Sequence, residues 1–184
     1  MDFILGGYWL LAGQPYFVTS RLYEPTAPDA EAVRATIAKW TAFAKAYRAP
    51  RPSGGAGLLY SSMIHLLRPS LRGLEAVAHV TADSSLPMRA LISVLNPTAS
   101  ALQQRVTVPL YYTGLAPGTT VNVSSVAPSG SGIGAGWLAA TRAPLRTSAN
   151  ETHVLGGDKG AGFTEIVVEV TVEPASYAVL GVSV

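Results

Sequence analysis

The sequence of 184 residues contains no cysteine, which excludes disulfide bonds, thiolate metal ligands and cysteine nucleophiles. Charged residues make up 13% of the chain, where about a quarter is usual, so we expect another structure to cover part of its surface. No apolar run approaches the roughly 20 residues of a membrane span. The N-terminal segment MDFILGGYWLLAG has no early Lys or Arg and does not resemble a signal peptide, so the compartment stays open, extracellular or lumenal locations included.

The formal net charge is only +2, from 13 cationic and 11 acidic residues. The cationic residues are scattered along the chain, without the clustering and interleaved aromatic residues of a nucleic-acid surface. We therefore expect no nucleic-acid partner.

The segment MRALISVLNPTASALQQRVTVPLYYTGL, residues 88–115, predicts a strand, a turn and a second strand. Asn96-Pro97-Thr98 breaks the first apolar run, because proline disfavours helix at the preceding residue and asparagine suits a turn. From Leu102 to Leu110, apolar residues alternate with polar ones, which is typical of a strand with one buried and one solvated face. This pattern favours an antiparallel sandwich over a nucleotide-binding α/β domain.

The chain from Leu58 onward is expected to be β throughout. We predict strands near 58–67, 75–82, 88–95, 102–110, 119–126, 135–141, 163–172 and 176–184. Between residues 127 and 162 the pattern is interrupted by glycine and serine, and this long connection is expected to be partly mobile. The predicted fold is therefore mainly β, an antiparallel β-sandwich preceded by an amphipathic helix.

That helix is predicted over residues 29–47, before Pro50 and Pro52 end it. Its bulky apolar residues follow a 4, 3, 4, 3 spacing, which places them on one stripe of a 3.6-residue helix. The stripe consists of Val33, Ile37, Trp40, Ala44 and Tyr47. Such a stripe is expected to pack against another surface.

Taken in order, several segments resemble the C-terminal part of a glycoside hydrolase-like protein of the α-galactosidase and α-amylase type. The helix AVRATIAKWTAFAKAYR resembles the last helix of the (β/α)8 barrel in such proteins. The segments SSMIHLLRPSLRGLEAVAHV, RALISVLNPT, VPLYYTGL and VTVEPASYAVLGV resemble the C-terminal sandwich that follows that barrel. GGYWLLAGQPYFVTSRLYEP resembles the end of the barrel itself, so the likeness spans nearly the whole chain except roughly 127–160.

The resemblance implies a barrel-end remnant over residues 1–52 and a sandwich over residues 53–184. It implies that the chain is a fragment, with the barrel of a longer parent chain as its partner. Val33, Ile37, Trp40 and Tyr47 would form the barrel-docking face. Hydrolysis of a glycosidic bond needs two facing carboxyl groups at the ends of barrel strands, and these would lie upstream. The chain is then expected to be a non-catalytic accessory domain that supports a carbohydrate-active barrel.

The residues offer no catalytic or metal-binding set of their own, and no cofactor is expected. Glu165 and Glu169 fall on the solvated face of one predicted strand, about 13 Å apart, which is too far for the usual carboxylate pair. His65, His79 and His153 are widely separated and match no metal-ligand spacing. No GxSxG motif is present for a serine nucleophile.

Four aromatic residues are candidates for carbohydrate contact, because amphipathic rings stack on sugars while keeping a polar edge. They are Trp9, Tyr111, Tyr112 and Trp137. The alternative, which we favour from sequence, is that the tyrosines cover a sheet edge and Trp137 fills the core. Asn122 and Asn150 begin N-glycosylation triplets, which matter only in a secreted protein.

If the aromatic residues are exposed, an alternative to the accessory role is a free-standing module that binds glycan or protein.

Overall fold

The computed structural model describes residues 26, 28–48, 57–116, 119–126, 151–154 and 165–184. One helix and a short 3-10 turn come first: α2 (Ala30–Arg48) and η2 (Leu58–Tyr60). The strands and a second 3-10 turn follow: β1 (Ser62–Leu67), β2 (Glu75–Val80), β3 (Met88–Asn96), β4 (Leu102–Pro109), η3 (Tyr111–Thr113), β5 (Thr120–Ser125), β6 (Glu151–Val154), β7 (Glu165–Val172) and β8 (Ser176–Ser183).

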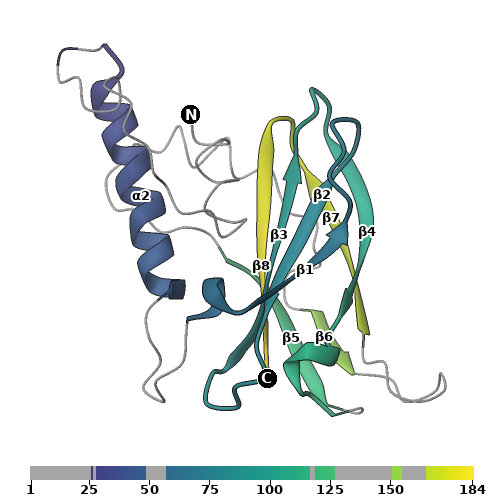
Figure 1. The fold of residues 1–184 in the computed structure, drawn as a ribbon. Helices are drawn as coiled ribbons and strands as arrows, with labels where there is room; N and C mark the ends of the chain where they lie inside the picture. The colour runs from purple at the N-terminus through teal and green to yellow at the C-terminus, as the bar shows by residue number, and fades with distance from the viewer. Residues whose placement is uncertain (1–25, 27, 49–56, 117–118, 127–150, 155–164) are drawn as a thin grey trace.

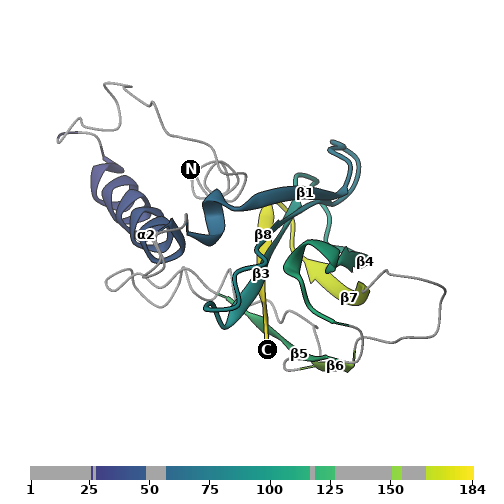
Figure 2. The same ribbon diagram turned by 60° about the horizontal axis from the view of Figure 1, so that its bottom comes forward.

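Within these residues, eight strands form two sheets in which every pairing is antiparallel. The larger sheet has the order β1-β2-β3-β8-β5-β6, and the smaller sheet consists of β4 and β7. Figure 2 shows β4 and β7 on one side of β3 and β8, with α2 on the other side. The prediction of a mainly β antiparallel sandwich with a preceding helix is confirmed.

The core between the sheets is built from the alternating residues of the facing strands. In β7, four apolar side chains face inward, whereas Glu165, Val167 and Glu169 face outward. The inward set is Ile166, Val168, Val170 and Val172. These residues meet the inner face of the six-stranded sheet, which includes Ile92 and Leu180, both fully buried. Because fully burying a Val or Leu side chain stabilises by about 1.5–3 kcal/mol, this inner layer holds the two sheets together.

The outer face of the six-stranded sheet is covered by α2 and η2. Leu91 of β3 and Val179 of β8 pack there against Trp40 of the helix and Leu59 of the 3-10 turn. Strand β3 is therefore buried on both faces from Ala90 to Asn96. The helix covers the side that would otherwise be solvated, and the apolar character of Leu91 and Leu95 agrees with this burial.

The chain passes between the two sheets whenever it enters or leaves β4 or β7, and Asn96 links two of these connections, β3–β4 and β7–β8. Strand β3 belongs to the larger sheet and β4 to the smaller one, so their connection is a crossover and not a hairpin. The Asn96 amide donates hydrogen bonds to the carbonyl oxygens of Ser100 and Val172, each 2.8 Å long. Its oxygen accepts from the amide of Thr98 (3.0 Å), and the Thr98 carbonyl accepts from the amide of Ala175 (3.1 Å).

Within the described residues, the predicted strands match the structure except at Leu58–Tyr60, and the structure adds a strand, β6, that the sequence did not predict. Residues Leu58–Tyr60 form a 3-10 turn and not the start of a strand, because Leu58 and Leu59 turn into the interface beneath α2. The predicted strand 135–141 lies outside the described residues. Strand β6 lies inside the expected 127–162 interruption, since Glu151–Val154 pairs with β5 although it has little apolar alternation. The division into domains at residue 53 stays a prediction.

Candidate functional site

Two exposed tyrosines follow the end of β4. Tyr111 is 61% exposed and Tyr112 is 53% exposed, and their ring centroids lie 5.3 Å apart. The ring planes meet at 83°, so the rings form a near right-angled pair. The rings are therefore not buried, and the alternative favoured by the sequence, that these tyrosines cover a sheet edge, stays a prediction.

The local sequence explains why both rings face solvent. Leu110 and Thr113, on either side of the pair, are fully buried and anchor the 3-10 turn η3. The Thr113 hydroxyl donates a hydrogen bond to the carbonyl oxygen of Leu110, which closes the turn. Gly114 then adopts a left-handed conformation (φ 66°), where a residue without Cβ avoids a steric penalty. With both flanking residues turned inward, Tyr111 and Tyr112 are left on the surface.

The turn η3 lies against the loop between β2 and β3. A Cβ added to Gly114 would stand 3.5 Å from the Cβ of Ala82, which places the two loops in contact. The loop is held by Asp83, whose Oδ1 accepts hydrogen bonds from the amide (2.9 Å) and hydroxyl (2.7 Å) of Ser85. Arg89 donates to the Ala82 carbonyl oxygen (3.2 Å). The loop that contacts the turn through Ala82 therefore carries polar groups.

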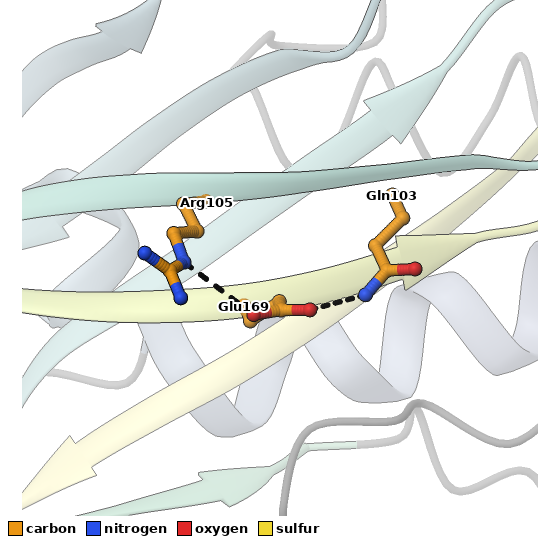
Figure 3. Close-up of polar contacts among 3 residues, drawn as sticks. All are labelled: Gln103, Arg105 and Glu169. Atoms are coloured by element: carbon orange, nitrogen blue, oxygen red, sulfur yellow. Dashed lines mark hydrogen bonds and ion pairs between the residues drawn. The ribbon is translucent and has the colours of Figure 1, made fainter.

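A second polar surface lies on the solvated face of β4 and β7. Arg105 and Glu169 are directly opposite across the two strands, with 3.5 Å between Arg105 Nε and Glu169 Oε2 (Figure 3). Gln103 donates to the other oxygen of Glu169, so both carboxylate oxygens are engaged (Figure 3). With Gln104, these residues line a shallow, open depression of about 340 Å³. Because the Arg105 and Glu169 side chains are 79% and 45% exposed, the ion pair is worth about 0–1 kcal/mol.

The acidic residues of this surface are poorly placed for glycosidic chemistry. Glu165 and Glu169 both face solvent from β7, four residues apart. At about 3.3 Å per residue, their backbones are about 13 Å apart, beyond the usual separation of catalytic carboxyl groups. Among the residues that the structure describes, no cluster of three or more His, Asp or Glu side chains could hold a metal ion.

The helical stripe predicted from sequence packs within this chain. Trp40 is fully buried, and its ring makes edge contacts with Phe43 (centroids 5.5 Å apart) and with Tyr177 of β8 (5.1 Å). Lys39 donates to the Tyr177 hydroxyl (3.0 Å), and its ammonium lies 5.4 Å from the Trp40 ring centroid, in range of a cation–π interaction. We call this group, Lys39, Trp40, Phe43 and Tyr177, the helix clamp (α2 in Figure 1).

The other members of the stripe lie beside the clamp or along the same face of α2. Val33 and Ala44 are buried, and Ile37 and Tyr47 are partly buried, the last two packing against the cluster beneath the helix. Burial raises the pKa of the Tyr47 phenol. The structure thus gives this stripe a contact inside the chain, and a contact with a barrel stays a prediction. Sequence analysis missed Phe43 and Tyr177, although Phe43 stands three residues after Trp40 and thus beside it on the helix.

Of the remaining predicted site residues, the structure describes only Asn122. Trp9, Trp137 and Asn150 lie outside the described residues. Asn122 faces solvent from β5, and its glycosylation stays a prediction. In the part of the chain that is described, no helix is long and apolar enough to span a membrane.

The described residues define an antiparallel two-sheet sandwich with a helix fixed to its outer face. No family model matches the chain, and no curated protein matches it. Among solved structures, it is similar to pullulanase from Bacillus acidopullulyticus, with 11% sequence identity and a TM-score of 0.35. The match covers 82% of this chain and 14% of the pullulanase chain, so this chain corresponds to a small part of that protein. The similarity is a distant one.

Proposed function

We propose that the chain is a non-catalytic accessory β-sandwich of a glycoside hydrolase-like protein, in which it supports a carbohydrate-active barrel. The helix clamp carries this proposal. In the resemblance found from sequence, the helix corresponds to the last barrel helix. Trp40 and Tyr177 fix this helix to the outer face of the sandwich, so the sandwich would brace the end of the barrel.

The chemistry of the described surface supports a non-catalytic role. Retaining and inverting glycosidases need two carboxyl groups roughly 5–10 Å apart across the scissile bond. Glu169 is engaged by Gln103 and Arg105, and Glu165 lies further along the same strand. Neither arrangement provides an acid and a base on opposite sides of a substrate.

Two measurements on the purified chain test the accessory role. With a panel of aryl glycosides, we expect no turnover above the buffer rate. Turnover that scales with protein concentration and disappears in Glu169→Gln or Glu165→Gln would overturn the proposal.

Amide hydrogen exchange tests whether the helix clamp holds α2 on the sandwich. Trp40→Ala should speed exchange across α2 while leaving β4 and β7 protected. Unchanged exchange in α2 would contradict the clamp.

A second candidate function is glycan binding, and the exposed pair Tyr111 and Tyr112 favours it. An exposed aromatic ring held in a rigid turn offers a flat apolar face and a hydroxyl to a sugar ring at low entropic cost. Titration calorimetry against a glycan panel tests this function, with Tyr111→Ala and Tyr112→Ala as variants. If no member of the panel releases heat on binding, the glycan-binding function is wrong and the accessory role is unaffected.

A further inference from the structure

The angle between the two exposed tyrosine rings limits the shape of a ligand that they can hold. A flat crystalline polysaccharide is best contacted by coplanar rings, since each ring then stacks on a different unit of the same surface. Tyr111 and Tyr112 meet at 83° and therefore cannot both lie against one plane. One ring can stack on the apolar C–H face of a pyranose, and the other then stands beside that sugar as a wall.

The turn that carries both rings is held in place before any ligand arrives. Leu110 and Thr113 are fully buried on either side of the pair, and the Gly114 amide donates to the Tyr111 carbonyl oxygen (3.3 Å). A rigid aromatic pair loses little conformational entropy on binding, so even a small contact area can give measurable affinity.

The surroundings of the pair fit a neutral ligand rich in hydroxyl groups. The β2–β3 loop, in contact with η3 through Ala82 and Gly114, exposes the side chains of Ser84 and Ser85. Asp83 and Arg89 also belong to this region, and they brace the loop through hydrogen bonds of their own. Stacking on the ring and hydrogen bonding to hydroxyl groups are the two interactions that a sugar offers.

We propose that Tyr111 and Tyr112 form a corner that binds a single pyranose unit of a soluble, neutral oligosaccharide and does not bind a flat crystalline glycan. This proposal rests on the glycan-binding function and narrows its ligand class. The unit stacks on one tyrosine ring, meets the edge and hydroxyl of the other, and hydrogen-bonds toward the β2–β3 loop.

The test uses the full chain with two soluble probes, maltohexaose and cellohexaose, and with microcrystalline cellulose as the planar probe. We expect calorimetric binding of at least one soluble probe and no retention on cellulose. Tyr111→Ala and Tyr112→Ala should each weaken that binding about tenfold, which corresponds to about 1.4 kcal/mol. Leu71→Ala is the matched control, because Leu71 is 86% exposed in the β1–β2 turn at the other end of the sandwich. The affinity of this variant for the soluble probes should equal that of the unchanged protein.

Three other outcomes separate failure of this inference from failure of the glycan-binding function. If the protein is retained on cellulose and the tyrosine variants are not, the pair binds a flat glycan. The proposed corner is then wrong, whereas the glycan-binding function stands. Soluble binding that survives both substitutions would move the site elsewhere and overturn the assignment to these tyrosines. Absence of binding to all three probes, in a protein with an unchanged circular dichroism spectrum, would overturn this inference, and the glycan-binding function would fall with it if the wider glycan panel also shows no binding.

Discussion

Replacing Asn96 with alanine should destabilise the sandwich more than most single substitutions on its surface. Asn96 is fully buried where β3 leaves the six-stranded sheet, and its amide group links the β3–β4 connection to the end of β7. In Asn96→Ala, the buried carbonyl of Val172 loses its side-chain donor, at about 1–3 kcal/mol for an unsatisfied buried group. Loss of the bonds to Thr98 adds about 1 kcal/mol, whereas the Ser100 carbonyl keeps the Thr98 hydroxyl as a donor.

The expected decrease in the free energy of unfolding is therefore about 2–4 kcal/mol, a large part of the 5–15 kcal/mol typical of a domain. Urea denaturation followed by far-UV circular dichroism measures it. Ser100→Ala is the matched control: Ser100 is exposed in the same turn and bonds to Asn96 and Thr98 through its backbone, so stability should change by less than about 0.5 kcal/mol. Asn96→Asp keeps the accepting oxygens but turns a charge toward two carbonyl oxygens, so it should lose at least as much stability as alanine. A loss below about 1 kcal/mol for both Asn96 variants, with an unchanged denaturant slope, would refute the reasoning.

Two further substitutions test the interface between the helix and the sheet. Ser93 is fully buried on β3, and its hydroxyl has no hydrogen-bond partner within the described structure. Ser93→Ala should therefore raise the free energy of unfolding by up to about 1 kcal/mol. If urea denaturation shows that the variant is clearly less stable, the hydroxyl is hydrogen-bonded and the prediction is wrong. Because burial raises the pKa of Tyr47, the folded state resists ionisation of this phenol, and stability should fall as pH rises above about 10, where the unfolded phenol ionises. The free energy of unfolding of Tyr47→Phe should fall less steeply with pH over that range. If it falls equally steeply in the variant and the unchanged protein, Tyr47 does not contribute to this pH dependence.

The sequence predicts strands best where one face is buried and the other is solvated. In β7 buried and exposed positions alternate along the strand, in β4 they alternate from Arg105 to Val108, and both strands appear within a few residues of the predicted ranges. The apolar run at Leu58 and Leu59 carries no such alternation, so its composition predicts a strand where the chain forms a 3-10 turn. Strand β6 is short and polar, and it forms only because β5 offers it a partner edge.

Alternation along a strand does not identify the neighbouring strand. Residues 88–110 show two strands and a turn, but the structure places β3 and β4 in different sheets. The crossover depends on tertiary hydrogen bonds from Asn96, one of them to Val172, 76 residues away in sequence. A turn signature such as Asn-Pro indicates that the chain changes direction, but it does not predict which sheet the chain enters next.

The aromatic residues separate into two groups that composition alone treats alike. Trp40, Phe43 and Tyr177 are drawn into the helix clamp by helical spacing and by the pleat of β8, and their rings are used for packing. Tyr111 and Tyr112 stay outside, because the residues on either side of them anchor the turn. The two groups share no residue, so bracing and glycan contact can be tested independently. Trp40→Ala should loosen α2 without changing sugar affinity, and a variant of either exposed tyrosine should change affinity without loosening α2.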